Sequence, residues 1–158
     1  MENPIFKKRK HHDLNSLIES KYKVNTEKAD KNIFYVRLEG PSDSLYKDGL
    51  WDIVIELPLE YPYKSPSIGF INKIYHPNVD FASGTICLDV INETWSPMYS
   101  LFNIIDVFLP QLLTYPNPSD PLNIKASEEM LNNTSLFEEN VKINIEKFAK
   151  NNISSIKY

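Results

Sequence analysis

The chain has 158 residues, 42% of them hydrophobic and 24% charged, which suits one globular domain with a core of ordinary size. Its 17 basic and 21 acidic residues leave a formal net charge of −4, so composition gives no reason to expect nucleic acid or a membrane as a partner. No apolar run approaches a membrane span, and charges fill the first residues where a secretory leader needs an apolar block.

The first segment combines a basic run with a helical pattern. Four consecutive cationic residues form the run, Lys7, Lys8, Arg9 and Lys10. Apolar residues follow at helical spacing, at Leu14, Leu17 and Ile18. Such a run is a solvated helix face, a docking surface or a nuclear-import signal, and the residues alone leave all three open.

Alternating apolar residues predict an antiparallel meander after this helix. A short strand at 22–25 and a polar turn at 27–32 come first. Apolar side chains then recur with the period of a strand in three places: Phe34, Val36 and Leu38; Trp51, Ile53, Ile55 and Leu57; and Ile68 and Phe70. Because short turns join these segments, we expect a four-stranded antiparallel sheet with one face against helices, an α+β fold.

A proline-rich loop separates the last two strands. Pro58, Pro62 and Pro66 exclude regular structure there, and an aromatic residue before proline favours a cis bond at Tyr61–Pro62. From the residues alone, Pro62 and Tyr63 form a rigid loop with a partly buried ring.

The C-terminal half predicts helices. Ser100 caps a central helix with a broad apolar face, and Pro110 should kink it near Asp106. A proline-set loop follows at 115–121, then a short helix at 126–131. A capping box at Ser135–Glu138 opens the last helix, whose inner face carries Phe137, Val141, Ile145 and Phe148. We expect one domain over 1–158, with a loose end at 151–158.

The stretch from His76 to Pro97 contains the only cysteine, Cys87. One cysteine excludes an internal disulfide, so we expect a reducing setting, the cytoplasm or the nucleus. A lone cysteine is commonly a buried apolar residue. Here the polar turn residues Asp80, Ser83 and Gly84 precede it and favour a sulfur at an accessible edge. No zinc site is expected, because the histidines and Cys87 lack ligand spacing.

Three motifs stand in this stretch: His76-Pro77-Asn78, Gly84-Thr85-Ile86-Cys87-Leu88 and Trp95-Ser96-Pro97. They resemble the signature of the ubiquitin-conjugating (E2) family, which is His-Pro-Asn, then Gly-x-Ile/Val-Cys-Leu, then Trp-Ser-Pro. The resemblance runs from the first helix to about Phe148. It implies the UBC-like fold, with an N-terminal helix, a four-stranded meander, a central helix and two C-terminal helices. It also implies that Cys87 accepts ubiquitin as a thioester and passes it to a substrate lysine. No cofactor is needed, because an upstream activating enzyme uses the ATP.

The resemblance assigns further roles, each with a structural alternative. Asn78 would stabilise the oxyanion of the transfer step, or its side chain ties down the turn. Asp120 would orient the lysine and help to remove its proton, or it is a turn residue before Pro121. His76 is structural rather than the base of a Cys-His hydrolase, since no third orienting residue accompanies it.

The resemblance also implies partners. The basic run, Lys7 to Lys10, would face the activating enzyme and ligases, and a RING-type ligase would hold Pro62, Tyr63, Ser96, Pro97 and Met98. Residues 61–70, 87–92 and 108–113 resemble the E2-H enzymes, which serve the GID/CTLH ligase. The chain departs from many E2 enzymes by one extra residue between Asn78 and Cys87, and it ends without the acidic tail common in that subgroup.

We expect a monomer acting on protein substrates, with no metal, nucleic acid or membrane bound. Two other readings stay open. One is a non-catalytic E2-like module that binds ubiquitin or a ligase, and the other is an E2 for a ubiquitin-like modifier.

Overall fold

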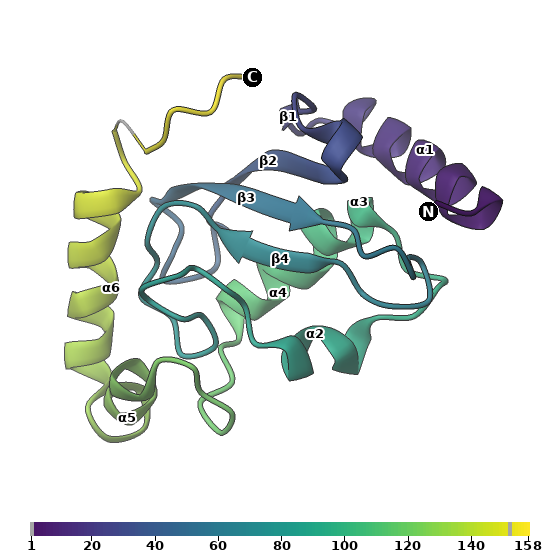
Figure 1. Ribbon diagram of the computed structural model, residues 1–158. Helices are drawn as coiled ribbons and strands as arrows, with labels where there is room; N and C mark the ends of the chain where they lie inside the picture. The colour runs from purple at the N-terminus through teal and green to yellow at the C-terminus, as the bar shows by residue number, and fades with distance from the viewer. Residues whose placement is uncertain (1, 152) are drawn as a thin grey trace.

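The computed structural model describes residues 2–151 and 153–158 (Figure 1). Its elements are α1 (Pro4–Ile18), β1 (Val24–Asn25), the 3₁₀ turn η1 (Ala29–Lys31), β2 (Ile33–Glu39), β3 (Leu50–Glu56), β4 (Ser67–Phe70), α2 (Leu88–Thr94), α3 (Leu101–Asn103), the π-helical η2 (Ile104–Phe108), α4 (Leu109–Thr114), α5 (Ile124–Asn132) and α6 (Thr134–Phe148). In the described residues the strands form a four-stranded sheet in the order β1-β2-β3-β4, each antiparallel to its neighbour, which confirms the predicted meander.

The inner face of the sheet is apolar because alternate residues of β2 and β3 point the same way. Direct cross-strand partners on this face are all buried: Phe34 with Ile55, Val36 with Ile53, and Leu38 with Trp51. The helical stretch α3–η2–α4 crosses this face in Figure 1 and adds Ile105 and Leu109 to the same core. None of the helices in the described ranges has the length and apolar character needed to cross a bilayer.

Pro110 disturbs the central helix in a specific way. A proline ring has no N–H to donate and excludes the carbonyl four residues earlier, here that of Asp106. The chain widens into the π-helical segment η2 just before it, and the N–H of Leu109 bonds to the carbonyl of Ile104. Ser100 caps this stretch as predicted, its side chain accepting from the N–H of Asn103.

Some sequence predictions are wrong at helix ends. Ile18 is half exposed, and Phe6 and Asp13 are buried in α1 instead, because the helix turns a different stripe to the core. The last helix has no capping box at Ser135. Asn133, two residues before the predicted cap Ser135, caps it instead, and its side chain accepts from the N–H of Leu136. The sequence also missed α2, a short helix without a clear apolar period.

Residues 153–158, which the sequence leaves as a loose end, contact the outer face of the sheet. In Figure 1 residues 153–158 run back toward β1. The carbonyl of Lys157 accepts from Asn25 Nδ2 (2.7 Å), and the hydroxyl of Tyr158 donates to Asp52 Oδ1 (2.7 Å). Ser154 also bonds to Asp52, which lies on the outer face yet is fully buried. The covering segment therefore explains a buried carboxylate on a face without a helix.

Candidate active site

The loop that carries the cysteine, residues 76–87 (the Cys87 loop), is fixed by backbone pairing. Gly69 bridges to Thr85, and Val79 bridges to Ile86, so the loop extends the edge of β4. The N–H of Cys87 then donates to the carbonyl of Asn78 (3.0 Å), which closes the loop on itself. Cys87 is thereby fixed in position immediately before the first residue of α2.

A glycine turn makes this pairing possible. Gly84 has a φ of +78°, a left-handed conformation that side chains rarely adopt, and a Cβ there would lie 1.9 Å from the carbonyl oxygen of Phe70. Asp80 closes the same turn by accepting from the N–H (2.9 Å) and hydroxyl (2.6 Å) of Ser83. These bonds from Ser83 lower the pKa of Asp80. The predicted tight turn at Ser83-Gly84 is confirmed.

Cys87 is less accessible than the sequence predicts. Only 9% of the residue's surface is exposed, because its apolar neighbours Ile86, Val90 and Ile91 turn into the core. The exposed residues beside it are Leu88 and Asp89. In place of the expected accessible edge, the structure has a largely covered cysteine.

Two carboxylates lie beside the sulfur of Cys87. The sulfur of Cys87 and one carboxylate oxygen each of Asp89 and Asp120 lie within 4.8 Å of one another. Both acidic residues are exposed. The structure thus brings Asp120 to the cysteine across 33 positions of sequence (120 − 87), as the resemblance implies. Asp89 was not among the predicted site residues. Its signal was its place two residues after Cys87, in the first turn of the helix the sequence missed.

The same three residues are the group in the described part of the chain whose possible ligand atoms lie close enough together to meet at one metal ion, as exposed acidic groups commonly do without binding one. One sulfur and two carboxylates supply three ligands, whereas a structural zinc site has four. The histidines considered from the sequence are not part of this group.

Asn78 joins the Cys87 loop to the loop that carries Asp120. It is fully buried, and its Oδ1 accepts from the N–H of Asn117 (2.8 Å). Its Nδ2 donates to the carbonyl oxygens of Asn117 (2.7 Å) and Asp120 (3.1 Å). Both amide protons are therefore engaged in holding the loop that carries Asp120, which is the structural alternative for this residue. An oxyanion role requires one of these two bonds to be exchanged for a bond to substrate.

His76 holds the backbone of Asn78 through a hydrogen bond. Its Nδ1 accepts from the N–H of Asn78 (3.0 Å), so its Nε2 carries the proton and donates to the carbonyl of Leu112 (2.8 Å). Complete burial lowers the pKa of His76 to about 4, so the ring is neutral at pH 7. With both nitrogens engaged, His76 is not placed to act as a base, in agreement with the sequence interpretation.

The predicted ligase-binding residues fall on two adjoining loops. Tyr63 is 64% exposed and Met98 is 96% exposed, with Ser96 and Pro97 also at the surface. Pro62, predicted to contact the ligase, is buried instead, and its carbonyl accepts from Trp95 Nε1 (3.0 Å). The Tyr61–Pro62 bond is cis. The ring centroid of Trp95 lies 5.5 Å from that of Tyr61, so the two loops are in contact at their bases.

The basic run divides into two pairs. Lys7 and Lys8 are exposed. Lys10 donates to the carbonyl of Ala29 (2.8 Å) and to Asn32 Oδ1 (2.6 Å), so its ammonium group is committed to the turn after β1. Arg9 is likewise bonded within the chain. Lys7 and Lys8 are therefore the more exposed members of the run, and Arg9 and Lys10 are partly covered.

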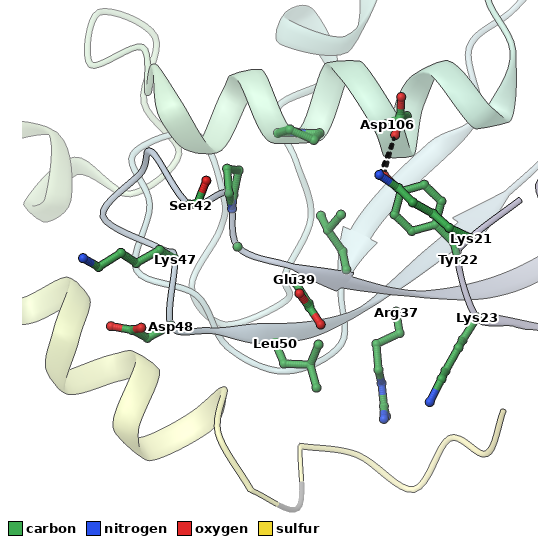
Figure 2. A pocket seen from close by; sticks show the side chains of 14 residues that line it. Lys21, Tyr22, Lys23, Arg37, Glu39, Ser42, Lys47, Asp48, Leu50 and Asp106 are labelled. Carbon is green, nitrogen blue, oxygen red and sulfur yellow. Dashed lines mark hydrogen bonds and ion pairs between the residues drawn. The ribbon is translucent and has the colours of Figure 1, made fainter.

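A groove of about 910 Å³ lies elsewhere, between the end of β2 and the central helix (Figure 2). Charges of both signs line it, among them Lys21, Arg37, Glu39 and Asp106. Asp106 accepts from the hydroxyl of Tyr22 (2.7 Å) and pairs with Lys21 (3.6 Å). No residue of the Cys87 loop lines this groove.

Comparison with known proteins identifies the class. The family model described as "Ubiquitin-conjugating enzyme" matches residues 6–145. The chain belongs to the ubiquitin-conjugating enzyme family. It is 56% identical to ubiquitin-conjugating enzyme E2 6 of Arabidopsis thaliana over 143 residues, which is 90% of this chain and 78% of that protein. It is 50% identical to the 24 kDa ubiquitin-conjugating enzyme of Saccharomyces cerevisiae over 143 residues, 90% of this chain and 66% of the yeast protein.

Solved structures agree with this assignment. The E2 domain of a Toxoplasma gondii ubiquitin-conjugating enzyme superposes with a TM-score of 0.81 at 28% identity, covering 91% of this chain and 99% of that one. The UBC fold implied by the sequence motifs is thus confirmed, and the chain is a transferase of the ubiquitin pathway.

Proposed function

We propose that Cys87 is the residue that carries ubiquitin. In the first step its thiolate attacks the carbonyl carbon of the activating enzyme's ubiquitin thioester, and that enzyme leaves as a thiolate while the new C–S bond forms. In the second step the neutral amine of a substrate lysine attacks the same carbon. The C–N bond forms, Cys87 leaves as a thiolate, and the amine gives up one proton.

The observation that carries this proposal is the placement of Asp89 and Asp120, whose carboxylate oxygens lie within 4.8 Å of the sulfur and of each other. Two exposed carboxylates beside a thiol attract a lysine ammonium group. A carboxylate is also the group that takes the proton as the amine becomes nucleophilic. Asn78 supports the step by fixing the loop that carries Asp120, and its Nδ2 is the amide that would stabilise the oxyanion once a bond to that loop is exchanged.

Tyr63, Ser96, Pro97 and Met98 are proposed to bind a RING-type ligase. The support is their exposure on two loops in contact, with apolar side chains outward in Tyr63 and Met98. The resemblance of residues 61–70, 87–92 and 108–113 to the E2-H enzymes favours a GID/CTLH-type ligase. Lys7 and Lys8 are proposed to face the activating enzyme. We further propose that the chain works as a monomer in the cytoplasm or the nucleus, without a cofactor of its own.

A charging assay tests the central claim. The chain is incubated with activating enzyme, Mg-ATP and ubiquitin, and the products are separated with and without a thiol reductant. We expect an adduct that the reductant abolishes, a reductant-resistant ester with Cys87→Ser, and no adduct with Cys87→Ala. No adduct from either the unmodified chain or Cys87→Ser would defeat the catalytic proposal. Ubiquitin binding without an adduct would indicate the non-catalytic module, and charging only by a ubiquitin-like protein would indicate another modifier.

A further inference from the structure

Arg9 projects from α1 onto the loop of residues 96–99 (the Met98 loop). Its Nη1 donates to the carbonyl of Pro97 (2.6 Å), and its Nη2 donates to the carbonyl of Tyr99 (2.9 Å). The same Nη2 pairs with the carboxylate of Asp13 (3.1 Å). One guanidinium thus holds two carbonyl oxygens that flank Met98, from 88 and 90 residues away in the sequence.

A buried carboxylate orients this guanidinium. Asp13 is 1% exposed, and it also accepts from the hydroxyl of Tyr61. The guanidinium lies 5.7 Å from the centroid of the Tyr61 ring. Since the planar fork of arginine is aimed by the acid and the ring together, a lysine cannot reproduce the arrangement.

Apart from these bonds, the Met98 loop is supported at one end by Tyr99, which packs against the core with its ring centroid 6.0 Å from that of Trp95. Its remaining hydrogen bonds are local, from Met98 N–H to Ser96 Oγ (3.3 Å) and from Tyr99 N–H to the carbonyl of Ser96 (2.9 Å). Met98 itself is almost fully exposed. Without Arg9, the tip of the loop loses its two bonds to α1.

We infer that Arg9 is a positioning residue of the ligase-binding surface, and not part of the surface that meets the activating enzyme. This inference rests on the proposed binding of a RING ligase to the Met98 loop. Arg9 holds the loop in place before the ligase arrives, so the ligase need not order the loop itself. Lys7 and Lys8, which are exposed, remain for the activating enzyme.

The test compares Arg9→Gln and Arg9→Lys with Lys8→Gln, a matched loss of charge on the exposed face of the same helix. Amide hydrogen exchange at residues 98 and 99 reports on the loop without any partner. We expect exchange there to accelerate about tenfold in both Arg9 variants and to stay unchanged in Lys8→Gln. Equal exchange in all four proteins would overturn the inference, and thermal melting checks that each variant is folded.

The functional arm uses isolated RING domains as probes, taking forward one that accelerates lysine discharge by the charged, unmodified chain. We expect Arg9→Gln to raise KM for the RING domain on the order of tenfold, with kcat and ligase-free discharge changed less than about twofold. Arg9→Lys should remain close to Arg9→Gln. A slower charging step with an unchanged KM for the RING domain would return Arg9 to the activating-enzyme surface and overturn the inference.

A failure of the proposed function gives other results in these assays than a failure of the inference about Arg9. If the unmodified chain does not charge, the thioester proposal is wrong. If it charges but no RING domain accelerates discharge, the ligase proposal is wrong, and the inference about Arg9 as part of a ligase-binding surface is wrong with it.

Discussion

The Cys87 loop and the Met98 loop are held in opposite ways. The Cys87 loop supplies its own anchoring side chains: buried His76 and Asn78 bond to backbone groups of the loop and of residues 112 and 117. The Met98 loop is fixed from outside, by Arg9 on another element, and its tip stays in solvent. Chemistry at one sulfur needs atoms held within fractions of an ångström, whereas a surface for exchangeable partners needs exposed side chains on a loop of defined shape.

The sharpest way to break this contrast is Asn78→Ala. The change leaves the N–H and carbonyl of Asn117 and the carbonyl of Asp120 without their present partner. We expect a loss of about 4 kcal/mol in the free energy of unfolding, measured in urea, because each lost bond of this kind costs about 1 to 3 kcal/mol. Asn92→Ala, an exposed asparagine, is the control. A loss below about 1 kcal/mol with lysine discharge abolished would indicate that Asn78 serves the oxyanion and not the loop.

The second prediction concerns acid. Burial holds the pKa of His76 at about 4, against an ordinary value of 6.5, so the unfolded chain binds the extra proton between these pH values. The contribution of neutral His76 to the free energy of unfolding is therefore fully present above about pH 6.5. It is lost as pH falls toward 4, by about 3 kcal/mol in all. Urea unfolding across this range measures the slope. In His76→Gln the part of the slope due to this residue disappears, and an unchanged slope would contradict the assignment.

The third prediction tests the carboxylates of Asp89 and Asp120 beside Cys87. Asp120→Asn keeps the shape of the side chain and removes its charge and basicity. We expect single-turnover discharge to free lysine at pH 7 to fall on the order of tenfold to a hundredfold, about 1 to 3 kcal/mol in the barrier. Thioester formation should change much less. Asp89→Asn and the double variant show whether the two carboxylates act together, and discharge unaffected by all three would remove them from the mechanism.

The smallest effect on stability is expected at the exposed loop. Met98→Ala removes a side chain that is 96% exposed, so the free energy of unfolding should change by less than about 0.5 kcal/mol. Affinity for a RING domain should nevertheless fall. A large loss of stability would show that the side chain of Met98 itself holds the loop, which would contradict its being held by Arg9.

The sheet was predictable because its cause is local. Phe34, Val36 and Leu38 alternate in the sequence, and alternation alone fixes which face is buried. The placement of Asp120 beside Cys87 came only from the resemblance, since the hydrogen bonds through Asn78 join residues 39 and 42 positions apart.

Other features left no local signal. Arg9 reads as one more cation in a basic run, and its contacts become visible only once α1 and the Met98 loop are folded together. The covering of Cys87 depends on how far Ile86 and Val90 turn inward, which the surrounding turn residues do not reveal. The short helix α2 has too few residues for an apolar period.

The segment that covers the outer face of the sheet has a thermodynamic consequence. Ser154 and Tyr158 bond to Asp52, and Arg37, paired with Asp52, lies 4.7 Å from the centre of the Tyr158 ring. A molecule that seeks this face competes with residues already tethered there at high effective concentration. The apparent affinity of that molecule is its intrinsic affinity multiplied by the fraction of time the segment is detached, so removing residues 153–158 would strengthen such binding without adding a contact between the molecule and the face.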